Sequence, residues 1–416
     1  MATAQDKAVV NWLNTNAIPI EDAMQSTPLT SFTASAPQKF KNARIFGFGE
    51  ATHHTKEFFD LKAKFFKYLV EEQGVTLFLM EESYQAEEGI NRWISGGEGD
   101  INTIKQNFGH GIWRAKEIVE LLQWMRDYNT DKPREKQLRF YGIDNQFGKG
   151  LNTKLRAYDT KYTIGIPEDL LAVADSCANA PLQAGGLKKK WLNKMLPQLK
   201  QIRQLLENES DRLSVADAEE YYDHMRAFSY LEDYASHVAF PYAKFRDRDM
   251  YTNVLRILEH EGPQSKAFVW AHNAHIDKEG YADYNMPSLG SRLKEHFADD
   301  YYAVGFDFGK GKLYGAVFKD GEIKGWKVYA LEVPYEDTAA RTFIEASDNV
   351  FFIDIQTALK NKDVATFFNK KMNQLGLGGP GFDPASPAFY KIKQGKHFDG
   401  LIFVKTVSVA TYTFTF

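Results

Sequence analysis

The sequence predicts an α/β protein with a largely parallel central sheet flanked by helices. Short apolar runs rich in Val, Ile and aromatic residues, which are typical of buried strands, recur along the chain. Stretches with helical spacing separate the early runs, and this alternation favours parallel strand pairing. The chain of 416 residues is also too long for one small core, which indicates two or three domains.

The expected strands are apolar runs bounded by polar residues. The early strands are predicted at 43–49, 75–83, 138–144 and 266–273. The later strands are predicted at 301–308, 312–318, 349–355 and 400–409. Residues 375–390, "LGLGGPGFDPASPAFY", are rich in Gly and Pro and predict a loop with several turns.

Two helices are expected between the early strands, at 56–72 and 113–128. The first carries one apolar face, with Lys62 and Lys67 off that face. The apolar face consists of Phe58, Leu61, Phe65 and Leu69. The second, "WRAKEIVELLQWMRDY", repeats the pattern.

The stretch 150–262 is charged and helical, unlike its surroundings, and predicts an α-helical insertion that acts as a lid. The expected division is a first part of the α/β core at 1–149, the insertion at 150–262 and a second part of the core at 263–416.

The composition excludes several classes of protein. A net charge of −4 argues against a general binder of nucleic acids or acidic membranes. The single cysteine, Cys177, excludes an intrachain disulfide framework. No apolar run approaches the roughly 20 residues of a membrane span, and the N-terminus lacks the pattern of a signal peptide. We therefore expect a cytoplasmic protein without a nucleic acid or membrane partner; the sequence does not indicate an oligomeric state.

Polar side chains follow each of the early strands, at the point where the strand ends. In chain order they are Glu50 and His53, then Glu81 and Glu82, then Asp144 and Asn145, then His272, Asn273 and His275. The carboxyl ends of parallel strands share one edge of a sheet, where α/β proteins bind ligands. The sequence therefore predicts one pocket lined with Glu, Asp and His.

The first strand leads into an unusual turn, "IFGFGEATHHTKEFF" at 45–59. A G-x-G turn before a helix is typical of dinucleotide binding, but here it holds Glu50, His53 and His54 instead of a glycine-lined phosphate cradle. The helix entrance favours a carboxylate and lowers the pKa of a nearby histidine, so His53 is a candidate general base. Alternatively the pair caps the helix, although Thr55 is the better N-cap.

The other candidates also allow two interpretations each. Strand alternation is expected to send one of Glu81 and Glu82 into the pocket and the other toward a neighbouring helix, unless both are solvated. His272 and His275 have a spacing that suits metal binding, donation to an oxyanion or mutual hydrogen bonding. His110 either flanks the pocket or is structural. The chain lacks the H-E-x-x-H, G-x-S-x-G and P-loop motifs.

Taken together, the motifs resemble those of the erythromycin esterase family. They follow the family's order from about residue 40 to the C-terminus: "GEATHHTKEFF", "LMEES", "FYGID", "RDRDM", "VWAHNAHI", "MPSLGSRLKEHF", "YYAVGFDFGKG" and "FDGLIFVKT". The resemblance implies an α/β core with a helical insertion. It also implies hydrolysis of a macrolide lactone without a metal or other cofactor.

The resemblance also implies roles for particular residues. His53 corresponds to the general base and Glu50 to its neighbouring acid, while Lys62 stands where some members have arginine. The remaining catalytic candidates are Glu81, His272 and His275. Asp144, His54 and His110 are expected to contact the substrate, and His54 replaces a residue that is often small.

Because no nucleophilic Ser or Cys is in place, direct attack by a water that His53 activates is the expected mechanism. Glu50 or Glu81 would orient the imidazole, and His272, His275 or Lys62 would donate to the oxyanion or the leaving alkoxide. Two alternatives stay open: a metal-dependent hydrolase of another ester or amide, and a non-catalytic accessory protein on the same scaffold.

Overall fold

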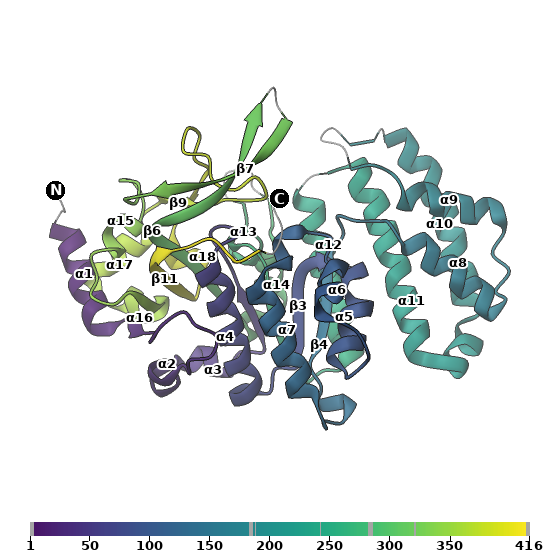
Figure 1. Cartoon of the computed structure of the whole chain (residues 1–416), viewed down its shortest axis with the longest axis horizontal. Helices are drawn as coiled ribbons and strands as arrows, with labels where there is room; N and C mark the ends of the chain where they lie inside the picture. The colour runs from purple at the N-terminus through teal and green to yellow at the C-terminus, as the bar shows by residue number, and fades with distance from the viewer. Residues whose placement is uncertain are drawn as a thin grey trace.

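A central nine-stranded sheet organises the molecule (Figure 1). The computed structural model describes residues 4–182, 186–187, 189–241, 243–281, 286–319 and 322–412. The strand order is β1-β8-β11-β6-β2-β5-β3-β4, and β7 pairs with β6 outside this path.

Six neighbouring strands are parallel, which confirms the predicted fold class. They are β11 (Gly400–Val407), β6 (Tyr301–Lys319), β2 (Ile45–Phe48), β5 (Ala267–Trp270), β3 (Leu77–Ser83) and β4 (Arg139–Asp144). At the other edge, β8 (Val350–Asp354) pairs antiparallel with β11 on one side and with β1 (Ile18–Pro19) on the other.

The strand predictions differ from the structure in three places. The predicted strands 301–308 and 312–318 form one continuous β6, because the backbone at 310–312 still pairs with β11 or β7. β7 (Glu322–Leu331) was not predicted, since its mostly exposed residues give no apolar run. The ends of the predicted loop 375–390 join a small hairpin of β9 (Met372–Leu375) and β10 (Phe389–Ile392).

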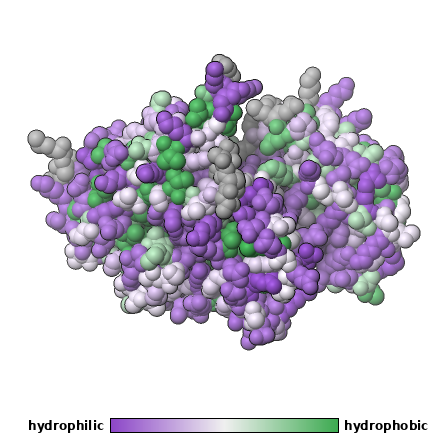
Figure 2. All heavy atoms as spheres, viewed as in Figure 1, coloured by the Kyte–Doolittle hydropathy of each residue, from purple (hydrophilic) through white to green (hydrophobic). Residues whose placement is uncertain are grey.

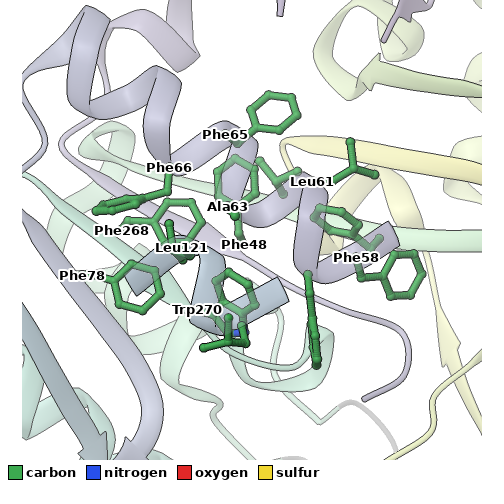
Figure 3. Close-up of a cluster of buried hydrophobic side chains, with 14 of the residues drawn as sticks. Phe48, Phe58, Leu61, Ala63, Phe65, Phe66, Phe78, Leu121, Phe268 and Trp270 are labelled. Atoms are coloured by element: carbon green, nitrogen blue, oxygen red, sulfur yellow. The ribbon is translucent and has the colours of Figure 1, made fainter. Parts of the chain in front are cut away.

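Helices cover both faces of the sheet, and alternate strand residues point into one of two cores. One face carries α2 (Thr30–Ser35), α3 (Gln38–Asn42), α4 (Lys56–Gln73), α5 (Glu87–Ile94) and α7 (Lys116–Asn129). The predicted apolar face of α4 is buried there among aromatic rings of the strands, including Phe268 and Trp270 (Figure 3).

The opposite core is covered by a second set of helices. They are α1 (Ala4–Asn16), α12 (Ala243–Glu261), α14 (Leu289–Phe297), α15 (Ala340–Phe343), α16 (Ile355–Lys360) and α17 (Lys362–Asn369). The short helices are α6 (Ile101–Ile104), α13 (Asn273–Ile276) and α18 (Gln394–His397), with 3-10 turns η1 (Tyr84–Ala86), η2 (Lys105–Asn107), η3 (Gly111–Arg114), η4 (Arg134–Lys136) and η5 (Ala298–Asp300).

The helical stretch 150–262 consists of two parts. The helices α8 (Leu151–Tyr162), α9 (Glu168–Ala178), α10 (Lys189–Asn208) and α11 (Ser210–Ala239) share their own core and form a layer at one end of the molecule (Figure 1). Cys177 is buried in that core, and burial raises the pKa of its thiol to about 12. In contrast, α12 packs on the sheet through Met250, Val254 and Ile257. The expected domain boundaries and the lid movement stay predictions.

The molecular face in Figure 2 is mostly hydrophilic, with apolar residues in small separate groups. Across the described ranges, no helix combines the length and apolar character needed to cross a membrane. The cytoplasmic location stays a prediction.

Candidate active site

The polar residues that follow the early strands meet at one edge of the sheet. Glu50 and His53 follow β2, Glu81 lies in β3, and His272 and His275 follow β5. All five side chains are buried. Direct contacts link them to one another and to the first turns of α12, so four segments far apart in sequence build one site.

The turn after β2 holds His53 by a hydrogen bond to Glu50. Its Nδ1 lies 2.5 Å from Glu50 Oε1. A carboxylate only accepts, so Nδ1 donates, and in the neutral ring Nε2 is left as an acceptor. Thr55 occupies the N-cap position of α4 without a side-chain cap bond. Helix capping therefore does not explain Glu50 and His53, which instead bond to each other.

Behind Glu50 lies Lys62, which is fully buried. Its ammonium donates to Glu50 Oε2 at 2.7 Å and lies 4.1 Å from the centre of the Trp270 ring. The sequence placed Lys62 off the apolar face of α4, but the pairing with Glu50 allows it to be buried. Burial lowers the pKa of Lys62 to about 8, although Glu50 opposes this effect.

This pKa predicts a loss of activity above about pH 8, because neutral Lys62 no longer anchors Glu50. Lys62→Arg should extend activity to higher pH, since arginine stays charged. Between pH 8 and 10.5 the unfolded chain binds the Lys62 proton and the folded chain does not, so this group makes stability rise with pH. Initial rates from pH 6 to 10 test the expected change in activity, with Lys67→Arg as the control. An unchanged alkaline limb in Lys62→Arg would contradict the role.

His272 faces His53, with ring centres 5.2 Å apart. It is the N-cap of α13, and its Nδ1 accepts the backbone N–H of Ala274 at 3.2 Å. Nε2 therefore carries the ring proton, and among the described residues it has no hydrogen-bond partner. Burial, reinforced by His53, holds the pKa of His272 well below its ordinary value. His272 is thus a neutral N–H donor in the site.

Glu81 is held by two cationic side chains. Its Oε1 accepts from Arg246 at 2.6 Å and lies 3.2 Å from His275 Nε2, and its Oε2 accepts the backbone N–H of His272 at 2.8 Å. Burial alone would raise the pKa of Glu81, but His275 and Arg246 outweigh it and hold this pKa well below its ordinary value. Glu81 therefore stays ionised at neutral pH.

Arg246 is a site residue that the sequence analysis did not single out. Its guanidinium binds Asp144 through two bonds of 3.0 and 2.8 Å and so connects β4 to β3 through Glu81. Asp144, expected to contact the substrate, is fully buried and anchors Arg246. The sequence signal for Arg246 was the "RDRDM" motif. Within a charged helical stretch, however, the first arginine of this motif resembles a solvated residue.

Glu82 points away from Glu81, as strand alternation predicts, but toward a loop and not a helix. It accepts the backbone N–H groups of Ser83 at 2.5 Å and His110 at 3.0 Å. Burial raises the pKa of Glu82 to about 7. The His110 ring lies beside the site, with Nε2 3.9 Å from Asp144 Oδ2.

His54 points away from His53 into an aromatic cluster. Its backbone is left-handed, with φ of 64°, and its Nδ1 lies 2.9 Å from the Tyr412 hydroxyl. The rings of Tyr314 and Trp326 are each 5.4 Å away. Burial lowers the pKa of His54 to about 3. Substrate contact by the His54 and His110 rings stays a prediction.

The carboxylates of the site already have cationic partners. Glu50 pairs with Lys62, whereas Glu81 and Asp144 share Arg246. Within the described ranges, no three His, Cys, Asp or Glu side chains are grouped so that they could hold a metal ion.

The fold and site define a mixed α/β protein with a buried network of histidines and carboxylates at the ends of parallel strands. The chain belongs to the erythromycin esterase family, whose model matches residues 70–407. The matched part includes Glu81, Asp144, Arg246, His272 and His275, and begins after the turn with Glu50 and His53. Membership of this family indicates a hydrolase of the esterase type.

Two relatives match most of this chain at low sequence identity. Erythromycin esterase type II of Escherichia coli is 25% identical over 334 residues, covering 72% of this chain and 78% of the relative. The putative hydrolase YbfO of Bacillus subtilis is 21% identical over 332 residues, covering 73% of each chain.

Solved structures have the same fold. A Bacillus cereus protein superposes with a TM-score of 0.82 at 24% identity, covering 98% of both chains. A protein described as a succinoglycan biosynthesis protein gives 0.81 at 21% identity, covering 99% of this chain and 100% of the other. A mutant of the erythromycin esterase EreC in its open conformation gives 0.69 at 15% identity, covering 94% and 97%. At these identities the likeness shows the fold alone.

Proposed function

We propose that this protein hydrolyses the lactone ester of a macrolide by direct attack of water that His53 activates, without a metal. The observation that carries the proposal is the buried chain Lys62–Glu50–His53, which faces the neutral donor His272. Family membership supports an ester as the substrate, and the name of the Escherichia coli relative supports a macrolide.

His53 is the proposed general base. Glu50 fixes its Nδ1–H, which leaves Nε2 to take a proton from water as the water oxygen attacks the ester carbon. Glu50 also stabilises the imidazolium that forms, and Lys62 holds Glu50 in place. When the tetrahedral intermediate collapses, the bond to the alkoxide breaks and His53 returns the proton to the leaving oxygen.

His272 is the proposed donor to the oxyanion. Its Nε2–H has no partner among the described residues, so a carbonyl oxygen can accept from it without breaking an existing bond. A neutral imidazole also leaves the nearby His53 free to gain a proton, which a second charged ring would oppose.

The rings around the two histidines suit an apolar ester. Trp113 packs edge-on against His53 with ring centres 5.6 Å apart, and Tyr390 lies 6.1 Å from His272. A macrolactone is large and mostly apolar, and such surfaces bind it better than an exposed polar edge would.

Metal independence is part of the proposal and is supported by the charge pairing of the site. A metal would have to displace Lys62 from Glu50 or Arg246 from Glu81, and each displacement would leave a cation buried and unpaired.

The test is to incubate the purified protein with macrolides of several ring sizes, with and without EDTA, and to follow their mass. We expect a gain of one water that EDTA does not prevent. Turnover that requires a metal would favour the metal-dependent alternative. No mass change with any macrolide would contradict the proposed substrate.

A further inference from the structure

Charged and polar groups surround His275, which lies next to Glu81 in the site. Its Nδ1 lies 2.9 Å from Asp247 Oδ1 of α12, and its Nε2 lies 3.2 Å from Glu81 Oε1 of β3. Arg246 of α12 lies 3.1 Å from the same Nε2, and the Tyr281 hydroxyl lies 3.0 Å from Nδ1. Among the described residues, the titratable groups in direct contact with the ring are therefore Asp247, Glu81, Arg246 and Tyr281.

Two carboxylates on opposite sides of one imidazole favour its doubly protonated state, although the Arg246 guanidinium beside Nε2 opposes the ring charge. A neutral ring donates from one nitrogen only, so either Glu81 or Asp247 would face a lone pair. A doubly protonated ring donates to both. Burial opposes the charge, but Asp247 and Glu81 outweigh it and raise the pKa of His275 to about 10.

Burial and a backbone hydrogen bond hold Asp247 in a fixed position. It is fully buried, and its second oxygen accepts the backbone N–H of Leu289 at 2.8 Å. From Asp247 a continuous chain of contacts runs through His275 to Glu81, and from Glu81 Oε2 to the backbone N–H of His272. The proposed oxyanion donor thus lies at the end of this chain.

We infer that Asp247 is a positioning residue, which keeps His275 doubly protonated and thereby fixes Glu81 and the backbone that carries His272. The inference rests on the proposed function. It also implies that Glu81 serves neither as base nor as nucleophile, because both of its oxygens are engaged. His53 is then the base of the site.

The decisive variant is Asp247→Asn. Asparagine has the same shape, and its oxygen still accepts from Leu289, but the negative charge beside His275 is lost. We expect the titration midpoint of the His275 ring, followed by NMR of isotope-labelled protein, to fall by about one to three pH units. We expect kcat for the cleaved ester to fall about tenfold to a hundredfold, with KM changed less than threefold or so. Asp247→Glu should recover part of kcat.

Asp249→Asn is the matched control. Asp249 lies two residues further along α12, is also buried and pairs with Arg248 and Asn145, away from His275. It should leave the His275 titration unchanged. A His275 midpoint that is the same in Asp247→Asn as in the natural protein would overturn the inference, as would a natural protein whose His275 is neutral at pH 8.

The NMR titration needs no substrate, so it separates this inference from the proposed function. A shifted midpoint without any macrolide hydrolysis would support the role of Asp247 and refute the substrate. Macrolide hydrolysis with an unshifted midpoint would support the substrate and refute the role of Asp247. The titration of the natural protein alone tests the charge state if the variant does not fold.

Discussion

Replacing His53 with alanine is expected to lower kcat/KM by about a hundredfold to ten-thousandfold. His53 is the proposed base, because Glu50 occupies its Nδ1 and leaves Nε2 for the water proton. Glu81 is already engaged by Arg246 and the His272 backbone. The loss should appear mainly in kcat, because the base acts in the transition state. Steady-state rates on a macrolide that the natural protein cleaves provide the measurement.

His296→Ala is the control for this variant, since His296 is an exposed histidine on α14. Both variants should unfold within a few degrees of the natural protein, because each removes a small ring without leaving an unpaired buried charge at neutral pH. Near-normal turnover by folded His53→Ala would exclude His53 as the base.

The second prediction with a large expected effect concerns His272. Two substitutions at this position distinguish the role of Nδ1 from the role of Nε2. Asparagine can retain the oxygen acceptor near Nδ1 that caps α13, but it has no group at Nε2. Glutamine places an amide N–H near the Nε2 position. We expect His272→Asn to lose about a hundredfold to a thousandfold in kcat, which is typical of a missing oxyanion donor. His272→Gln should retain clearly more activity.

Circular dichroism and thermal unfolding should be similar for both His272 variants, which shows that the comparison concerns chemistry. If Asn and Gln reduce kcat equally, the Nε2–H is not the donor. If neither variant affects kcat, the site does not stabilise the oxyanion through His272 at all.

The sequence predicted the parts of the molecule in which local pattern and tertiary environment agree. The stripe of Phe58, Leu61, Phe65 and Leu69 predicted a helix packed on a sheet, and α4 lies there (Figure 3). The apolar runs predicted the parallel strands, because strands buried on both faces need continuous apolar residues. Their polar ends predicted the position of the site, since parallel strands present those ends at one edge.

Other parts depend on contacts that local patterns do not reveal. Exposed β7 has no apolar run and is held by pairing with β6. Lys62 follows the apolar Leu61 in a helix, and nothing nearby in sequence indicates that Glu50 pairs with it after burial. Arg246 and Asp247 lie in a charged stretch, and only the packing of α12 on the sheet brings them to Glu81 and His275.

A single turnover in water enriched in the heavy oxygen isotope tests the central claim most directly. With protein in excess over a macrolide that it cleaves, direct attack by water activated by His53 places the heavy isotope in the new carboxylate of the first product. Attack by Glu50 or Glu81 would instead form a mixed anhydride that acylates the protein, and water attacking the glutamyl carbon of that anhydride would leave the first product unlabelled and place the isotope in the protein. Labelled product without a labelled or acylated protein is the predicted mass-spectrometric result; unlabelled product would contradict the mechanism.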